Sequence, residues 1–175
     1  MQRRFVIEAV LVAIYGQLLV PGRPVEYVIP YSTIMELYEL KEGAEPVMPN
    51  SAEDQFVREK IGELIGFFEA PFTKKKVERA LQAPWRTSPP IPVNEDVTFT
   101  IVNSLESAQY GEQLDPVETE IVLTALRTQV PVLTDQVEFI DKVIELEIPV
   151  EVFDIEDYEF ALEGHSPEED FNTGL

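Results

Sequence analysis

The feature that most constrains the fold is the regular alternation of helix and strand signals in the last third of the chain. Asp115 can cap a helix over residues 117–128, because its side chain can accept hydrogen bonds from the free N–H groups at a helix start. A strand at 130–134, a helix at 136–146 and a strand at 150–153 follow. Units of this kind build parallel sheets that helices cover on both faces.

The rest of the chain contains the same two kinds of segment. Short strands are predicted at 5–7, 25–29 and 97–102. Helices are predicted at 9–19 and 105–110, and three more are expected to start at the capping residues Ser32, Ser51 and Thr73. Residues 84–92 hold four prolines and are expected to be irregular. The sequence therefore predicts an α/β protein, a three-layer sandwich around a central, mostly parallel sheet of four to five strands.

Composition narrows what such a fold can do. The chain has 175 residues, enough for one domain, and 33 Asp and Glu against 13 Lys and Arg give it a formal charge of −20. That charge disfavours a generally basic nucleic-acid binder and docking on anionic lipid. The lack of Cys and the single histidine, His165, exclude disulfides, thiolate zinc sites, Cys nucleophiles and two-histidine metal sites.

The first 20 residues superficially resemble a signal peptide. Arg3 and Arg4 precede an apolar run from Phe5 to Val20, but Glu8 interrupts the run and no A-x-A cleavage site follows. The run is also shorter than the ~20 residues that a membrane helix needs. We therefore expect a buried strand followed by a buried helix, in a cytoplasmic protein without a membrane partner.

Carboxylates are the side chains left to carry chemistry, because the common glycine-rich phosphate loops and the G-x-S-x-G motif are absent. Glu8 and Asp135 each follow a predicted strand, at the edge where parallel sheets bind ligands. Glu36 lies in the helix after the second strand, and Glu118 lies in the first turn of the helix before the fourth. If the first and fourth strands are neighbours, the four acids converge, and Mg²⁺ or Mn²⁺ would relieve their repulsion. The alternative for each acid is a solvated surface carboxylate.

These segments resemble the PIN-domain nucleases. The run ETEIVLTAL followed by VPVLTDQVEFIDKVIELEIPVEVFD is similar to the family's acid-led helix, strand ending in T-x-D, helix and final strand. IPYSTIMEL resembles the segment that carries the family's metal-site glutamate, and FVIEAVL resembles its first strand. The resemblance covers about the first 40 residues and residues 98–154. It implies a metal-dependent ribonuclease fold with Glu8, Glu36, Glu118 and Asp135 at the metal site.

The resemblance has departures at the site itself. Glu8 and Glu118 stand where the family usually has aspartates, and Val10 stands where Asn is common. A usual site acid falls on Gln136, although Asp135 is adjacent. Glu reaches one methylene further than Asp, and a displacement of about 1 Å in an active site can cost ~10²-fold in rate. The departures put catalysis in doubt more than the fold.

The resemblance also sets the expected domain limits. Residues 1–154 form the PIN-like domain, in which 41–97 is a variable helical and Pro-rich insert. Residues 155–175 form an acidic tail that we expect to be flexible, because the sequence from Glu151 onward holds no Lys or Arg.

A basic stretch interrupts the acidic chain between residues 58 and 86. Within it, Lys74, Lys75, Lys76 and Arg79 are candidates to hold the phosphates of RNA. The alternative is a solvated helix face that balances the acidic bulk of the chain. An active ribonuclease would need this basic cluster to face the four acids.

Three functional hypotheses follow. The first is a ribonuclease in which the four acids hold Mg²⁺ or Mn²⁺ and a metal-bound water attacks the phosphorus. The second is a catalytically degenerate PIN-like scaffold whose charge of −20 attracts a basic protein partner. The third, a small-molecule enzyme on a nucleotide-binding α/β fold, lacks a glycine loop. The sequence leaves the RNA target, the partner and any homo-oligomer open.

Overall fold

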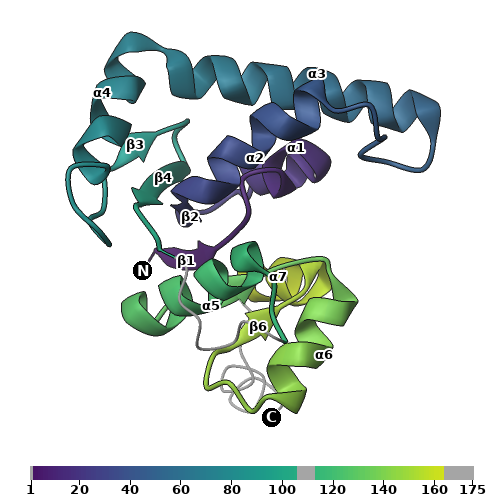
Figure 1. Cartoon of the computed structure of the whole chain (residues 1–175), viewed down its shortest axis with the longest axis vertical. Coiled ribbons are helices and arrows are strands. Elements are labelled where there is room, and N and C mark those ends of the chain that lie inside the picture. The colour runs from purple at the N-terminus through teal and green to yellow at the C-terminus, as the bar shows by residue number, and fades with distance from the viewer. Residues whose placement is uncertain (1, 106–112, 164–175) are drawn as a thin grey trace.

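The chain forms an α/β fold in the computed structural model, which describes residues 2–105 and 113–163 (Figure 1). The strands are β1 (Arg3–Val6), β2 (Val25–Pro30), β3 (Ile91–Pro92), β4 (Val97–Val102), β5 (Val132–Leu133) and β6 (Val152–Phe153). The helices are α1 (Leu11–Ile14), the 3₁₀ helix η1 (Gly16–Leu19), α2 (Tyr31–Glu42), α3 (Ser51–Glu69), α4 (Pro71–Ala80), α5 (Pro116–Thr128), α6 (Val137–Glu145) and α7 (Ile155–Leu162). Within the described ranges, none of the helices has the length and apolar character that a membrane crossing requires.

The six strands form one sheet in the order β3-β4-β2-β1-β5-β6. All neighbours pair in parallel except β3, which pairs antiparallel with β4 at one edge. Val6 of the central strand β1 pairs with Val28 of β2 on one side and with Val132 of β5 on the other. The predicted α/β class is confirmed. The sheet is larger than predicted, partly because β3 forms inside the proline-rich stretch that we expected to be irregular.

Helices cover both faces of the sheet, which gives three layers (Figure 1). On one face, Phe5, Tyr27 and Phe99 from neighbouring strands form an apolar core with buried side chains of α1 to α4 and α7. On the other face, Val6 and Val28 belong to a second core with α5 and α6. Successive strand residues point to opposite faces, so both faces of the central strands must be apolar to be buried.

Side-chain caps set the starts of α3, α5 and α7. In α5, Oδ1 of Asp115 accepts a hydrogen bond from the Glu118 N–H at 2.7 Å, and Oε1 of Glu118 accepts one from the Asp115 N–H at 3.0 Å. This reciprocal capping box confirms Asp115 as the predicted cap. The caps of α2, α3 and α4 lie one to three residues before the predicted ones, at Pro30, Asn50 and Ala70 instead of Ser32, Ser51 and Thr73.

The segment expected to be one helix at 9–19 is divided into α1 and η1. Tyr15 separates them with φ −114° and ψ 88°, outside the helical region. The break allows the Tyr15 side chain to reach the carboxyl edge of the sheet, where it contacts Asp135. The short helix expected at 105–110 lies, apart from Leu105, outside the described residues.

The start of the predicted acidic tail is part of the folded domain. Residues 155–162 form α7, so a flexible tail beginning at residue 155 is a wrong prediction for this segment. Tyr158 is 1% exposed, and its ring packs edge-on against Phe5 with centroids 5.2 Å apart. The Tyr158 hydroxyl shares a hydrogen bond with that of Tyr27, which itself donates to the Leu18 carbonyl at 2.6 Å. Residues 164–175, with His165, lie outside the described residues.

Candidate functional site

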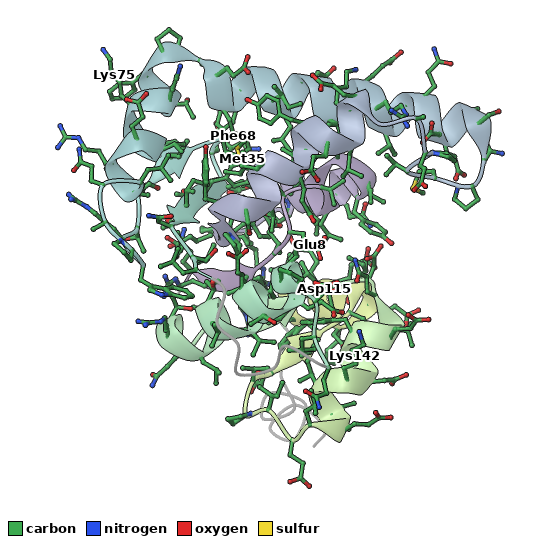
Figure 2. All side chains as sticks on the ribbon, in the orientation of Figure 1. Glu8, Met35, Phe68, Lys75, Asp115 and Lys142 are labelled. Carbon is green, nitrogen blue, oxygen red and sulfur yellow. The ribbon has the colours of Figure 1, made fainter. Side chains whose placement is uncertain are left out.

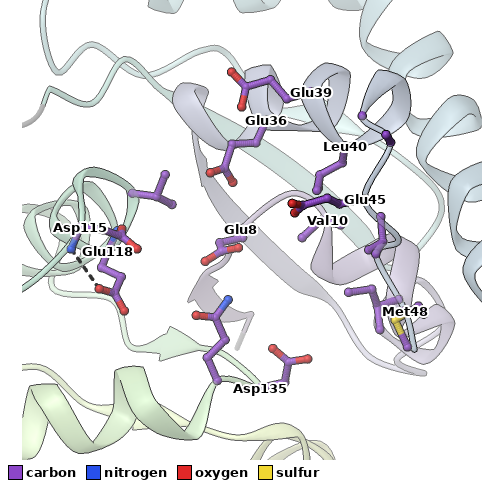
Figure 3. Close-up of a pocket in the computed structure, with 16 residues that line it drawn as sticks. Glu8, Val10, Glu36, Glu39, Leu40, Glu45, Met48, Asp115, Glu118 and Asp135 are labelled. Atoms are coloured by element: carbon purple, nitrogen blue, oxygen red, sulfur yellow. Dashed lines mark hydrogen bonds between the residues drawn. The ribbon is translucent and has the colours of Figure 1, made fainter. Parts of the chain in front are cut away.

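A cavity of about 660 Å³ opens at the carboxyl edge of the sheet, between α2, the end of β1 and the start of α5 (Figure 3). We call it the acid cavity, because carboxylates dominate its polar lining. The carboxylates belong to Glu8, Glu36, Glu39, Glu45, Asp115, Glu118 and Asp135. Among the described residues that line it, none is Lys, Arg or His. An anionic substrate would therefore be repelled unless a cation entered with it.

The topology places the acid cavity at the point where the strand order reverses. The chain leaves β1 toward β2, whereas β5 lies on the other side of β1 and continues to β6. Glu8 follows β1 and Asp135 follows β5, so both lie beyond the carboxyl ends of adjacent parallel strands. Open α/β sheets bind ligands in the crevice at such a switch point. The other two predicted acids, Glu36 and Glu118, also line this cavity, so the structure brings all four together there.

Glu8 and Glu36 are carboxylates whose charged forms are disfavoured by burial. Burial raises the pKa of Glu8 to about 7, and the charges of Glu36 and Asp135 add to the effect. Burial also raises the pKa of Glu36 to about 7, with further contributions from Glu39 and Asp115. In the described part of the chain, neither carboxylate has a hydrogen-bond or ion-pair partner, and both face the cavity (Figure 3).

Glu118 differs from these two because its carboxylate is already engaged. Its Oε1 accepts the Asp115 N–H in the capping box and lies 3.1 Å from Nζ of Lys142 on α6. The Glu118 side chain is 8% exposed, and the hydrogen bond that it accepts from Lys142, together with its negative charge, raises the pKa of Lys142. Glu118 thus joins the start of α5 to α6, and its negative charge is balanced by Lys142.

Lys142 was missed by the sequence analysis. The sequence does single out Lys142, because it is the one Lys or Arg after Arg127 in a chain of charge −20. The pairing itself spans 24 residues and depends on how α5 packs beside α6, which local patterns do not specify.

Asp135 is also held by a neighbour. Its Oδ2 accepts a hydrogen bond from the Tyr15 hydroxyl at 2.8 Å. Burial, together with this hydrogen bond and the charge of Asp135, raises the pKa of Tyr15 to about 12. Gln136, the next residue, lines the cavity as well. Asp135 is exposed, so it can exchange this contact for a ligand without unfolding its surroundings.

The donor set fits a divalent cation in its chemistry. Every charged group among the described lining residues is a carboxylate, and oxygen ligands suit Mg²⁺ and Mn²⁺. Among the described residues, no three acidic or histidine side chains are gathered closely enough to hold an ion as they stand. The carboxylates surround a cavity rather than a single point, and an ion would have to draw them together.

The predicted basic cluster does not face the acid cavity. Lys74, Lys75, Lys76 and Arg79 lie on α4, and none of the described lining residues comes from that helix. Figure 2 shows Lys75 near the junction of α3 and α4, well away from Glu8. The arrangement that RNA cleavage would require of this cluster is therefore absent from the described residues.

Comparison with known proteins adds no relative. No protein-family model matches the chain, and no curated protein matches it. The fold and the acid cavity are therefore the observations from which a function can be argued.

Proposed function

We propose that the acid cavity binds Mg²⁺ or Mn²⁺ and that the chain is a PIN-like nuclease hydrolysing RNA phosphodiester bonds. The observation that carries the proposal is the pair of partnerless carboxylates, Glu8 and Glu36, each with a pKa of about 7. Bringing two such groups together without a partner is costly, and a divalent cation relieves that cost. Strongly shifted carboxylates in a cavity are typical of functional sites.

The order of elements around the cavity supports the PIN-like part of the proposal. An acid-led helix, α5, is followed by β5, by Thr134 and Asp135, and then by α6 and β6. This is the order in which the sequence resembles the family. The location at a topological switch point supports ligand binding independently of any resemblance.

In this proposal, residues of the acid cavity and Lys142 beside it have roles in binding the ion or the RNA. Glu8 and Glu36 would hold the ion, with Asp135 exchanging its Tyr15 contact to join them. A bound divalent ion supplies an activated water and stabilises charge on the phosphate oxygens. Lys142 lies beside the cavity through Glu118 and would attract the phosphate backbone. The excess of carboxylates would keep RNA out of the cavity until the ion is present.

A scaffold without catalysis is the second candidate, and two specific observations favour it. The Lys142–Glu118 pair occupies one predicted ligand, and the basic cluster on α4 lies away from the cavity. A chain of charge −20 would then act by attracting a basic protein. Residues 164–175 are the segment to delete when testing this candidate, because a deletion starting at residue 155 would also remove Tyr158 from the core.

Calorimetric titration with Mn²⁺ tests the proposal. Any chain of charge −20 binds cations diffusely, so only saturable binding counts as evidence for a site. We expect one or two ions to bind, and Glu36→Gln to abolish that binding. Glu42→Gln is the matched control, since Glu42 is exposed on the same helix and outside the cavity lining. Equal binding in both variants would refute the site.

RNA cleavage is measured next, with a fluorophore-quencher RNA in Mn²⁺ and in EDTA. Cleavage that requires Mn²⁺ and is lost in Glu36→Gln is the expected result. Saturable Mn²⁺ binding without cleavage would overturn the nuclease part and favour the scaffold. Capture of a basic protein that depends on residues 164–175 would support the scaffold directly.

A further inference from the structure

A second cavity, of about 620 Å³, lies at the opposite end of the strands. We call it the amino-edge cavity, because the start of β1, the turn before β2, the chain after α5 and the start of β6 form it. Three arginines line it, Arg3, Arg4 and Arg23, against a single acid, Glu151, among the described lining residues. This is a local excess of positive charge in a chain that has 33 acids and 13 bases.

Two of the three arginines are free to bind a ligand. Arg4 forms an ion pair with Glu26, which also accepts a hydrogen bond from the Thr100 hydroxyl at 2.7 Å. Arg3 and Arg23 are exposed, and no carboxylate of the described chain lies within ion-pairing distance of either one. The parallel register brings them together, because Arg3 of β1 pairs with Val25 of β2. Two guanidinium groups are thus left with donors suited to a phosphate.

The rest of the lining is apolar or amide-bearing. Phe5 and Phe153 contact each other edge-on with centroids 5.3 Å apart, and Val130 and Pro131 continue this apolar wall. The amides of Gln2 and Gln129 also line the cavity and can donate or accept hydrogen bonds. A ligand that used the whole cavity would need a phosphate, a flat apolar body and polar edges.

Glu151 favours a nucleotide over free phosphate as the ligand. A carboxylate in the same cavity as two arginines weakens the binding of free phosphate, but it accepts hydrogen bonds from sugar hydroxyls. We propose that the amino-edge cavity binds a nucleoside monophosphate. Arg3 and Arg23 hold the phosphate, Glu151 accepts from the ribose, and the base lies against Phe153 and Pro131. The volume falls in the range of about 300–1,000 Å³ that small-molecule sites occupy.

This site goes beyond the proposed function and does not depend on it. The amino-edge cavity lies at the amino ends of the parallel strands, whereas Glu8 and Asp135 lie beyond their carboxyl ends. Glu36→Gln should therefore leave nucleotide binding unchanged. Failure of one proposal says nothing about the other.

Calorimetric titration of the full chain with AMP in EDTA tests this inference. We expect one AMP to bind per chain, and Arg3→Ala and Arg23→Ala each to weaken binding by about tenfold or more, because each removes charge-assisted hydrogen bonds. Arg79→Ala is the matched control, since Arg79 is exposed on α4 and outside the cavity, and it should change the affinity less than twofold.

Adenosine and inorganic phosphate, titrated separately, should each bind more weakly than AMP. No saturable AMP binding, or an equal loss in Arg79→Ala, would overturn the site. Inorganic phosphate binding as tightly as AMP would overturn the nucleotide as its ligand. Exposed arginines can be replaced without loss of fold, and equal melting temperatures of the variants check this directly.

Discussion

Nζ of Lys142 lies 3.1 Å from Oε1 of Glu118, and this pair joins α6 to the first turn of α5 at the rim of the acid cavity. The same Glu118 oxygen accepts the Asp115 N–H, so one carboxylate serves a helix cap and an ion pair together. Lys142 is not itself one of the described residues that line the cavity, but the pair places its positive charge against the lining residue Glu118. Glu118, one of the four carboxylates that the sequence predicts at the metal site, therefore already has hydrogen-bond partners.

Replacing Lys142 tests what that charge does. Lys142→Met removes a cation beside the cavity, so we expect Mn²⁺ to bind about three- to tenfold more tightly. The melting temperature should fall, because Glu118, at 8% exposure, loses its partner. Lys74→Met removes the same charge from α4 and is the control. An equal change in Mn²⁺ affinity in both variants would contradict a local effect.

The raised pKa values of Glu8 and Glu36 predict that stability falls as the pH rises. Both values are about 7, against an ordinary 4.5, so the native state binds more protons than the unfolded state between these limits. The free energy of unfolding should therefore decrease from pH 4.5 to above pH 7. Because solvent in the open cavity screens these charges, we expect a decrease on the order of 2 kcal/mol from this pair, less than the full shifts would give. Urea denaturation at pH 5 and pH 8 measures the difference.

Glu8→Gln and Glu36→Gln isolate this contribution. Each variant should be more stable than the parent at pH 8 by about 1–2 kcal/mol, and the gain should vanish as the pH falls below about 4.5, the ordinary pKa of the group. Glu42→Gln relieves general repulsion alone and should show a smaller gain. A pH-independent gain in Glu36→Gln would show that packing, and not titration, is responsible.

The convergence of the four acids could be predicted because each position depends on local signals. Glu8 and Asp135 follow strands, and Asp115 sets the start of α5 and hence the place of Glu118. Once the first and fourth predicted strands are adjacent, the sheet brings these acids to one edge. Only that adjacency had to be assumed.

Contacts between distant elements could not be predicted in the same way. The Lys142–Glu118 pair depends on helix packing, and the amino-edge cavity depends on the register that brings Arg3 near Arg23. The acidic composition after Glu151 suggested a flexible tail, although Tyr158 is buried in the core. The acidic residues of α7 lie on its exposed face, and composition alone does not show that the same helix also buries apolar side chains.

Tyr158 makes α7 a test of where the folded domain ends. Tyr158→Ala removes a buried ring that packs on Phe5, and we expect it to cost about 3–5 kcal/mol of unfolding free energy. Tyr158→Phe should cost about 1 kcal/mol, because Tyr27 keeps its hydrogen bond to the Leu18 carbonyl. Chemical denaturation measures both, with the exposed Glu156→Gln as control. A loss below 1 kcal/mol in Tyr158→Ala would mean that α7 is not docked.

The Tyr15–Asp135 hydrogen bond, 2.8 Å long, is measurable by a double-mutant cycle. Tyr15→Phe, Asp135→Asn and the double variant should give a coupling energy of about 0.5 kcal/mol, small because Asp135 is exposed. Since Tyr15 competes with an ion for Asp135, Tyr15→Phe should leave Mn²⁺ binding equal or up to about threefold tighter. Mn²⁺ binding weakened in Tyr15→Phe would instead show that Tyr15 positions Asp135 for the ion. The two outcomes lie on opposite sides of the parent affinity, so one calorimetric series separates competition from positioning.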